Sequence, residues 1–296
     1  MDLLKKLFPK PKPQPKTPSV EGVKTAPLDP SLVGPPPTSQ QVHLTIGVAQ
    51  SSGIERTHNE DAAMAIHGTM GSMEKVQEFG VFLVADGMGG HRSGEVASAI
   101  AARTVTSSLT ESALSALIEG NDAYAEPLQD LVRKALEEAN QLVVERVPGG
   151  GTTLTVAVLL GQQITLGHVG DSRAYMIEPG KTVVLSRDHS LVKRLEELGQ
   201  LTAEEADIHP QRNVLYRAIG QGANLEVDVT SHPFPAGGQL LLCSDGLWGV
   251  VPDPEIERIV TQTATPQSAC EQLVAAANAA GGPDNITAVL VRQNRN

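Results

Sequence analysis

Apolar residues follow two kinds of spacing along residues 42–292, one typical of strands and one typical of helices. Short runs of alternating or continuous apolar residues predict strands over 42–49, 62–66, 79–85, 152–160, 163–169, 173–177, 183–185, 225–230, 239–243 and 285–291. Apolar positions three or four residues apart predict helices over 93–109, 128–145, 191–198, 254–261 and 266–279. The triplet Gly149-Gly150-Gly151 ends the second of these helices.

The order of these elements predicts an α+β fold. Strands outnumber helices and occur in groups that suggest antiparallel meanders, with pairs of helices between them. This arrangement places helices outside the sheets and disfavours a βαβ nucleotide-binding fold. Residues 199–224 are charged and irregular, and we expect them to form an exposed insertion.

The first 40 residues differ from the rest of the chain. Residues 9–38 contain ten of the 20 prolines, a composition that predicts a disordered, polyproline-like tether over 1–40. A peptide ligand for an aromatic groove is the alternative to a simple spacer. Residues 1–8 lack the long apolar segment of a signal peptide. A short amphipathic membrane anchor is disfavoured, because one or two turns bury little area.

Charge narrows the range of partners. The net charge is −11, although residues 1–40 carry six lysines against three acidic residues, so the remaining chain is strongly acidic. An acidic surface repels nucleic acid, and a phosphorylated substrate would need bound cations nearby. The two cysteines, Cys243 and Cys270, have no zinc spacing and are interpreted as reduced core thiols of a cytoplasmic protein.

Acidic residues recur at the ends of predicted strands. Asp86 and Asp245 each follow an apolar run and precede glycine, Asp284 precedes the last strand, and Asp171 lies between two strands. The pair Glu60-Asp61 precedes another strand. One Asp-Gly is a common turn, but five such sites predict an oxygen-rich centre for Mg²⁺ or Mn²⁺.

The motifs that serve other kinds of phosphate chemistry are missing from the sequence. There is no nucleophilic-serine elbow, no phosphate-binding loop with Lys-Ser/Thr and no Cys-x5-Arg loop. Two divalent ions can activate water and polarise a phosphoryl oxygen without a nucleophilic side chain. The acidic residues therefore favour metal-assisted hydrolysis of a phosphate ester.

Six motifs in sequence order resemble the metal-dependent protein phosphatases of the 2C type, in their bacterial form. They are Arg56-Thr-His-Asn-Glu-Asp61, Asp86-Gly-Met-Gly-Gly90, Gly151-Thr-Thr-Leu-Thr155, Gly170-Asp-Ser-Arg173, Ser244-Asp-Gly246 and Asp284-Asn285. The resemblance covers about residues 42–292. It implies a four-layer α-β-β-α sandwich, with two antiparallel sheets between helix pairs and a flap over about 188–224.

The resemblance also assigns metal ligands. It implies that Asp86 bridges two Mn²⁺ or Mg²⁺ ions and that the carbonyl of Gly87 binds one of them. Asp245 and Asp284 would bind the other ion.

The remaining ligands implied by the resemblance act less directly. Glu60 and Asp61 would act mostly through metal-bound waters, and Asp171 together with Asp245 would hold a weaker third ion. Arg56 would bind the phosphate, for which a planar guanidinium is well suited. The alternative for Arg56 is a solvated surface charge.

The implied reaction is hydrolysis of phosphoserine and phosphothreonine in proteins without a covalent intermediate. The implied partners are phosphorylated proteins, including a serine/threonine kinase or its targets, and the implied state is a monomer. Met88 occupies a position where many eukaryotic relatives have the histidine thought to protonate the leaving alcohol. We hypothesise that His91 assists this protonation or contacts the substrate, and the alternative is a surface histidine near a helix start.

Other polar and aromatic residues receive structural interpretations. The seven histidines other than His91 have no metal-ligand spacing and are expected to be structural or exposed. Trp248 is expected to pack against the motif, and the hydroxyls of Thr152 and Thr153 to bond locally. Two alternative functions stay open: a phosphoesterase for small esters, and a catalytically dead regulatory relative. The second is disfavoured because Asp86, Asp245 and Asp284 are all present.

Overall fold

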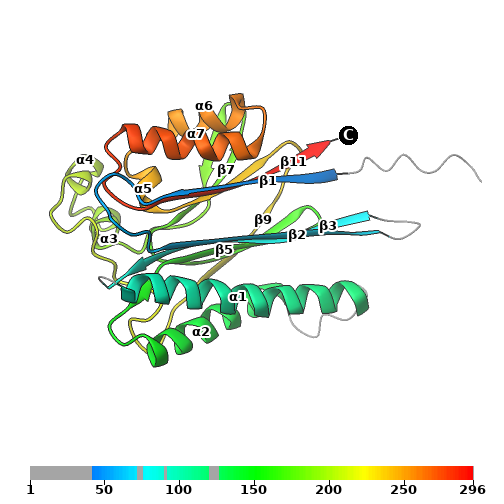
Figure 1. Cartoon of the computed structure of the whole chain (residues 1–296), viewed down its shortest axis with the longest axis horizontal. Coiled ribbons are helices and arrows are strands. Elements are labelled where there is room, and N and C mark those ends of the chain that lie inside the picture. Colours follow the sequence, from blue (N-terminus) through cyan, green and yellow to red (C-terminus); the bar gives the residue numbers. More distant parts are fainter. Residues whose placement is uncertain (1–41, 72–75, 90–91, 120–126, 296) are drawn as a thin grey trace, which may run out of the picture. The chain divides into compact units, whose positions relative to one another are not determined.

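Two antiparallel sheets face each other, and each is covered on its outer side by two helices (Figure 1). The structure is a computed structural model that describes residues 42–71, 76–89, 92–119 and 127–295. The predicted tether over 1–40 lies outside the described residues, as does His91. The four-layer α+β sandwich expected from the sequence is confirmed.

The first sheet pairs the first and last strands of the described chain. Its strands, in spatial order, are β1 (Val42–Ser51), β11 (Ile286–Arg295), β10 (Gln239–Cys243), β7 (Arg173–Glu178) and β8 (Lys181–Val184). On its outer face lie α6 (Asp253–Gln262) and α7 (Pro266–Ala279) (Figure 1).

The second sheet contains Asp61, Asp86 and the Gly151–Thr155 motif. Its spatial order is β2 (Asp61–Gly71), β3 (Val76–Met88), β5 (Leu154–Leu160), β6 (Gln163–Val169) and β9 (Asp228–Pro233), while β4 (Gly151–Thr152) pairs with the end of β3. Its outer face is covered by α1 (Arg92–Glu119) and α2 (Leu128–Arg146) (Figure 1).

Three short helices lie at one end of the sandwich: α3 (Leu191–Glu197), α4 (Ala203–Asp207) and α5 (Asp245–Trp248) (Figure 1). The sequence predicted α3 but not the other two. A capping box between Thr202 and Glu205 starts α4, and this pattern is readable from sequence. None of the helices in the described part of the chain is long and apolar enough to cross a membrane.

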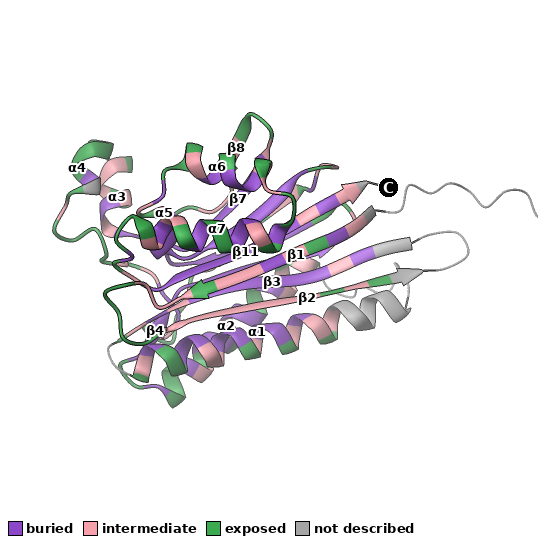
Figure 2. Cartoon of the chain, turned by 45° about the horizontal axis from the view of Figure 1, so that its top comes forward, coloured by how far each residue is buried: buried purple, intermediate pink, exposed green. Residues whose placement is uncertain are grey.

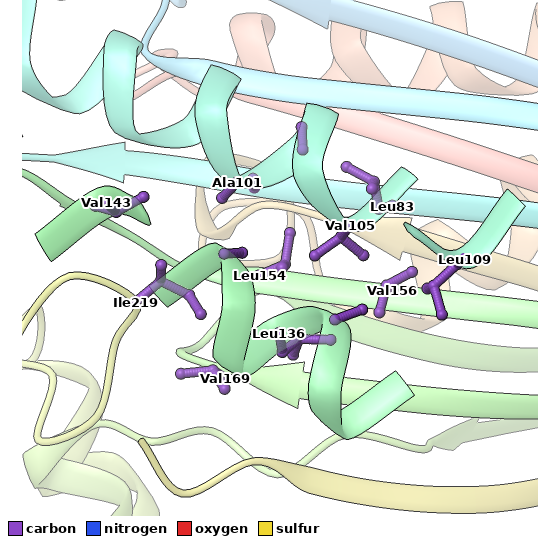
Figure 3. Packing of buried hydrophobic residues seen from close by; sticks show 14 of the residues in the cluster. Leu83, Ala101, Val105, Leu109, Leu136, Val143, Leu154, Val156, Val169 and Ile219 are labelled. Carbon is purple, nitrogen blue, oxygen red and sulfur yellow. The ribbon is translucent and has the colours of Figure 1, made fainter. Parts of the chain in front are cut away.

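Buried apolar side chains form three layers of core. Most buried residues lie on the strands and on the helix faces that cover them (Figure 2). One layer lies under α1 and α2, where Leu83, Val105 and Leu136 are fully buried (Figure 3). A second lies under α6 and α7, and it contains both free, buried cysteines. The third fills the space between the sheets. With few aromatic residues, Val, Leu, Ile and Ala supply most of this burial.

The observed elements differ from the predicted ones mainly at their ends. Helix α1 continues ten residues beyond the predicted end at Leu109, and β9 begins at Asp228 rather than Leu225. Leu225 and Val227 are partly buried against the core without joining a strand. Packing of apolar residues outside strands produces the same local pattern, so periodicity alone placed this boundary wrongly.

Candidate metal centre

Two acidic residues face each other at one end of the second sheet. Asp61 is the first residue of β2, Asp86 lies near the end of β3, and the antiparallel register places them directly opposite. Opposed residues on neighbouring strands have their Cβ atoms about 5 Å apart. The register therefore brings together two carboxylates that are 25 positions apart in the sequence.

Hydroxyl and backbone groups of residues 152–153 hold the backbone of Asp86. Its N–H donates to Thr153 Oγ1 (2.9 Å), and its carbonyl accepts from the Thr153 N–H (2.8 Å) and Thr152 Oγ1 (2.9 Å). The local hydroxyl bonding expected for these threonines is confirmed. It fixes the point from which the Asp86 carboxylate projects.

Asp61 connects the two sheets. Its Oδ2 accepts hydrogen bonds from Ser244 Oγ (2.8 Å) and Thr287 Oγ1 (2.6 Å), which lie at the ends of strands in the first sheet. Its Oδ1 is buried and has no hydrogen-bond partner among the described residues. One oxygen is thus used for positioning and the other remains available to a ligand.

Asp245 and Asp284 approach the same region from the first sheet. Asp245 begins α5, and its Oδ1 is also buried without a hydrogen-bond partner in the described part of the chain. A Cβ on Gly246 would lie 2.0 Å from the carbonyl oxygen of Asn285, so only glycine allows α5 to approach this closely. Asp284 Oδ1 accepts from the Asn285 N–H (2.8 Å).

Asn285 organises the loop that carries the first motif. Its Oδ1 accepts the N–H of Glu60 (2.7 Å), and its Nδ2 donates to the carbonyls of Ser52 (3.0 Å) and His58 (2.8 Å). Sequence reasoning quoted Asn285 within a motif but gave it no role. The available signal was a side chain with both a donor and an acceptor beside Asp284, an aspartate already predicted to bind metal.

The same loop places Arg56 and Glu60. Arg56 Nη2 donates to Asp284 Oδ2 (2.8 Å), and about half of the Arg56 side chain (52%) is exposed. The Glu60 carbonyl accepts the N–H of Gly87 (3.2 Å). A Cβ on Gly87 would lie 2.3 Å from the Gly94 carbonyl oxygen, so the end of β3 packs tightly against the first turn of α1.

Asp171 lies in the buried loop between β6 and β7. Its backbone carbonyl accepts a hydrogen bond from Trp248 Nε1 (3.0 Å). The Trp248 ring also lies 3.6 Å from the guanidinium carbon of Arg173, which forms an ion pair with Asp188 (2.7 Å). The expected packing role of Trp248 is therefore confirmed, and through it α5 is joined to the Asp171 loop.

Burial and mutual repulsion raise the pKa values of the acidic cluster. Burial raises the pKa of Asp61 to about 7 and that of Asp245 to about 6, and neighbouring carboxylates add to both shifts. For the same two reasons the pKa values of Asp86 and Asp171 lie well above their usual range. Bound cations would relieve this repulsion.

The donor set fits hard divalent ions. All the side-chain donors are carboxylate oxygens, which suit Mg²⁺ and Mn²⁺, and the free oxygens of Asp61 and Asp245 point to a missing partner. Within the described residues, no three acidic, histidine or cysteine side chains close around one point. Water and backbone carbonyls would therefore complete the coordination, as is common for Mg²⁺.

A cavity of about 630 Å³ adjoins these carboxylates. Arg56, Asp171, Asp245 and Asp284 line one part of it, and Val192 of α3 lines another. The predicted flap thus borders the same space as the acidic cluster. The predicted metal residues all lie at or near strand ends in the described part of the chain, whereas His91, which was predicted to act in catalysis, lies outside it.

Comparisons with known proteins agree with this geometry. Residues 47–286 match the family described as Protein phosphatase 2C. Serine/threonine phosphatase stp of Listeria innocua is 37% identical over 248 residues, which are 82% of this chain and 93% of that protein. Protein phosphatase PhpP of Streptococcus pneumoniae is 35% identical over 251 residues, which are 85% of this chain and 98% of that protein.

Solved structures show the same similarity. The Mycobacterium tuberculosis serine/threonine phosphatase PstP/Ppp superposes with a TM-score of 0.72 at 30% identity, covering 85% of this chain and 99% of that chain. The catalytic domain of PstP in complex with 2 manganese ions gives a TM-score of 0.70 at 28% identity, covering 86% and 100%.

Proposed function

The chain belongs to the protein phosphatase 2C family, and from this premise we propose which of its residues carry out the reaction. It is a metal-dependent serine/threonine protein phosphatase, a hydrolase that uses Mn²⁺ or Mg²⁺. Water attacks the phosphorus in line with the departing serine or threonine oxygen, so no side chain forms a covalent intermediate.

Asp86, Asp245 and Asp284 are the proposed direct ligands of two ions, with Asp86 shared between them and the Gly87 carbonyl contributing to one. The unpartnered buried oxygen of Asp245, at the junction of the two sheets, carries this assignment. When bound, the ions supply Lewis-acid activation of water and neutralise phosphoryl oxygens.

Three further carboxylates have proposed supporting roles at the ions. Asp61, held by Ser244 and Thr287, and Glu60 would orient coordinated water. Asp171, together with Asp245, would hold a weaker third ion. The raised pKa values of Asp61 and Asp171 support these roles, because burial and neighbouring charge favour a bound cation there.

Arg56 is the proposed phosphate-binding residue. Its guanidinium lies beside Asp284 and lines the cavity, so it can present two N–H donors to a phosphate at the acidic cluster. His91 is proposed to protonate the leaving alcohol, because Met88 cannot. A His91→Gln variant with an unchanged pH–rate profile would contradict this role.

We further propose that the physiological substrates are phosphorylated proteins of a serine/threonine kinase pathway and that the enzyme acts as a cytoplasmic monomer. The acidic net charge of −11 supports a protein rather than a nucleic-acid partner. Two free, buried thiols are consistent with a reducing compartment.

The deciding experiment is phosphate release from a phosphothreonine peptide by the full chain, with Mn²⁺ and then with EDTA. Asp245→Ala should abolish release, whereas Asp130→Ala on the outer helix α2 should retain it. Release by Asp245→Ala at the wild-type rate would refute the assignment. A wild type that binds Mn²⁺ without releasing phosphate would refute the function itself.

A further inference from the structure

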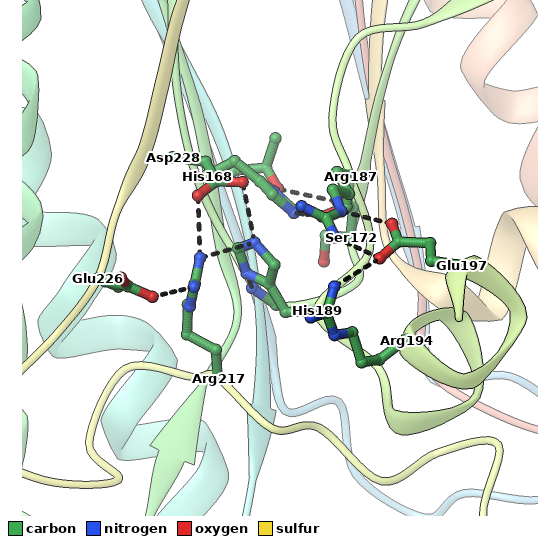
Figure 4. Close-up of polar contacts among 11 residues, drawn as sticks. His168, Ser172, Arg187, His189, Arg194, Glu197, Arg217, Glu226 and Asp228 are labelled. Carbon is green, nitrogen blue, oxygen red and sulfur yellow. Dashed lines mark hydrogen bonds and ion pairs between the residues drawn. The ribbon is translucent and has the colours of Figure 1, made fainter.

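We propose that His189 is a positioning residue that ties the Asp171 loop to the stem of the flap, defined as residues 187–191 and 214–219. The proposal rests on the function proposed above, in which Asp171 holds an ion. The carrying observation is a chain of contacts that runs from Gly170 through the buried His189 ring to Asp228 and Arg217. Figure 4 shows its part from His189 to Arg217.

The two sides of the stem are bonded to each other. The Tyr216 N–H donates to the His189 carbonyl (3.0 Å), and the Leu191 N–H donates to the Val214 carbonyl (2.8 Å). Helices α3 and α4 lie between these two sides, so their position follows the stem. The contacts that hold His189 in place therefore also help to position α3, which forms one wall of the cavity.

Both the backbone and the imidazole of His189 contact Gly170. The His189 N–H donates to the Gly170 carbonyl (2.7 Å), and its Nδ1 accepts the Gly170 N–H (3.1 Å). Gly170 has a φ of +111°, and a Cβ there would lie 2.5 Å from Thr153 Cβ. The peptide that precedes Asp171 is thus held between His189 and the residue that also holds the Asp86 N–H.

The contact with Gly170 determines the tautomer of His189. An Nδ1 that accepts a hydrogen bond carries no proton, so the proton of the neutral ring is on Nε2 and is donated to Asp228 Oδ2 (3.1 Å). Arg217 Nη1 lies 3.2 Å from the same Nε2 but is itself a donor, so in this tautomer it bonds to Asp228 rather than to the ring. Burial of the ring, of which 1% is exposed, lowers its pKa and keeps it neutral. Asp228, Arg217 and Arg187 are the charged groups that act on it.

Arg217, in the second segment of the stem, is the last residue in this series of contacts. Its Nη1 donates to Asp228 Oδ1 (2.9 Å), and its Nη2 pairs with Glu226 (Figure 4). On the other side, the His168 ring lies 4.9 Å from the His189 ring and bonds to Thr155 and to the Arg187 carbonyl. The imidazole of His189 contacts the Asp171 loop through Nδ1, while its Nε2 lies 3.1 Å from Asp228 Oδ2 and 3.2 Å from Arg217 Nη1 (Figure 4). The ring therefore joins the Asp171 loop to the Asp228–Arg217 ion pair.

Two substitutions separate the two contacts. His189→Asn places an oxygen near the Nδ1 position and keeps an acceptor for Gly170, whereas His189→Gln reaches toward Asp228 and loses that acceptor. The exposed His67 on β2 supplies the control, His67→Gln. Mn²⁺ binding to the full chain is measured by titration calorimetry, and the weak event is identified as the one missing from Asp171→Asn.

We expect His189→Gln to weaken the weak Mn²⁺ event by about tenfold, the lower range for loss of an outer-shell partner, and His189→Asn to restore most of the affinity. In the Asp171→Asn background, where the weak event is absent, His189→Gln should leave the remaining tighter Mn²⁺ binding unchanged. Side-chain ¹⁵N NMR of the wild type should show Nδ1 of His189 unprotonated.

Several outcomes would overturn the link: equal effects of the two His189 variants, a protonated Nδ1, or no event missing from Asp171→Asn. Because these readouts are binding and spectroscopy, they remain decisive even if the wild type releases no phosphate. That latter result would count against the proposed function alone. A melting scan of each variant shows whether lost affinity comes from unfolding.

Discussion

At the scale of single residues, the acidic cluster combines bound and unbound carboxyl oxygens. Asp61 uses Oδ2 for two hydroxyl groups of the other sheet, while its Oδ1 and that of Asp245 are buried with no partner in the described residues. A buried polar atom without a partner costs about 1–3 kcal/mol. The two unpartnered oxygens therefore do not add to the stability of the fold by themselves, which agrees with the proposed role in binding ions.

Replacement of Arg56 tests the phosphate contact. Arg56→Lys keeps the positive charge but loses the planar fork, so one charge-assisted hydrogen bond should be lost. We expect kcat/KM for a phosphothreonine peptide to fall about tenfold, since such a bond is worth roughly 1.5 kcal/mol. Steady-state kinetics at saturating Mn²⁺ measure the change, and an unaltered kcat/KM would exclude the contact.

His168 predicts an acid-dependent loss of stability. Burial, followed by repulsion from His189, lowers the pKa of His168 to about 4. Below about pH 6.5 this histidine binds a proton in the unfolded chain but not in the folded protein. The free energy of unfolding therefore falls as the pH falls from about 6.5 to 4, by at most roughly 1.4 kcal/mol per pH unit for this group.

His168→Gln should remove this pH dependence. The introduced glutamine can keep the hydrogen bond to the Arg187 carbonyl but loses the one to Thr155. We therefore expect the variant to have a lower free energy of unfolding at pH 7 but a smaller decrease in it between pH 7 and pH 5. Urea unfolding in EDTA at both values measures the difference, with His67→Gln as the control. An equal decrease in wild type and variant would show that His168 does not cause it.

At the scale of elements, glycines decide how closely the site-bearing ends approach each other. Gly87 lets the end of β3 meet the first turn of α1, and Gly246 lets α5 meet the loop before β11. At both positions an added Cβ would lie within 2.3 Å of a backbone oxygen. Neither backbone can move alone, because Asp86 and Asp284 are bonded beside these positions.

Gly246→Ala tests this requirement against Gly222→Ala, where an added Cβ meets nothing within 4 Å. We expect Gly246→Ala to lose about 1–3 kcal/mol through overpacking and to lose most Mn²⁺-dependent activity. Gly222→Ala should change stability by less than about 0.5 kcal/mol. Thermal melting and phosphate release measure both effects, and equal behaviour of the two variants would argue against the steric explanation.

At the scale of the whole catalytic region, the cluster lies where the two sheets meet. Asp61 and Asp86 belong to the second sheet, whereas Asp245 and Asp284 lie at strand ends of the first. Ions that use ligands from both sheets would connect the two halves of the sandwich. Metal binding and global stability should therefore be linked.

Metal removal tests this link. Mn²⁺ at 100 times its dissociation constant should stabilise the wild type by about 2.7 kcal/mol against the EDTA-treated protein. Asp245→Ala should abolish most of this gain, whereas Asp130→Ala should keep it. Differential scanning calorimetry with and without EDTA gives the shift, and a melting temperature that does not respond to Mn²⁺ would show that the folded protein does not bind the ion in preference to the unfolded chain.

The sequence alone was sufficient for the order and type of most elements and for singling out the acidic residues at the strand ends. Apolar periodicity reports which face of an element is buried, and Asp beside glycine at a strand end is a local pattern. The resemblance of six motifs then indicated the family, which the comparisons confirm. The predicted ligand roles and the tether over residues 1–40 stay predictions.

Only the tertiary structure decided which atoms meet. The register that opposes Asp61 and Asp86, the bonds from Asn285 to residues 52–60, and the link from Gly170 through His189 to Asp228 join distant parts of the chain. Local patterns cannot specify such contacts, because each depends on how strands and loops pack together. Two of the histidines expected to be structural or exposed, His168 and His189, belong to a connected polar network beside the site.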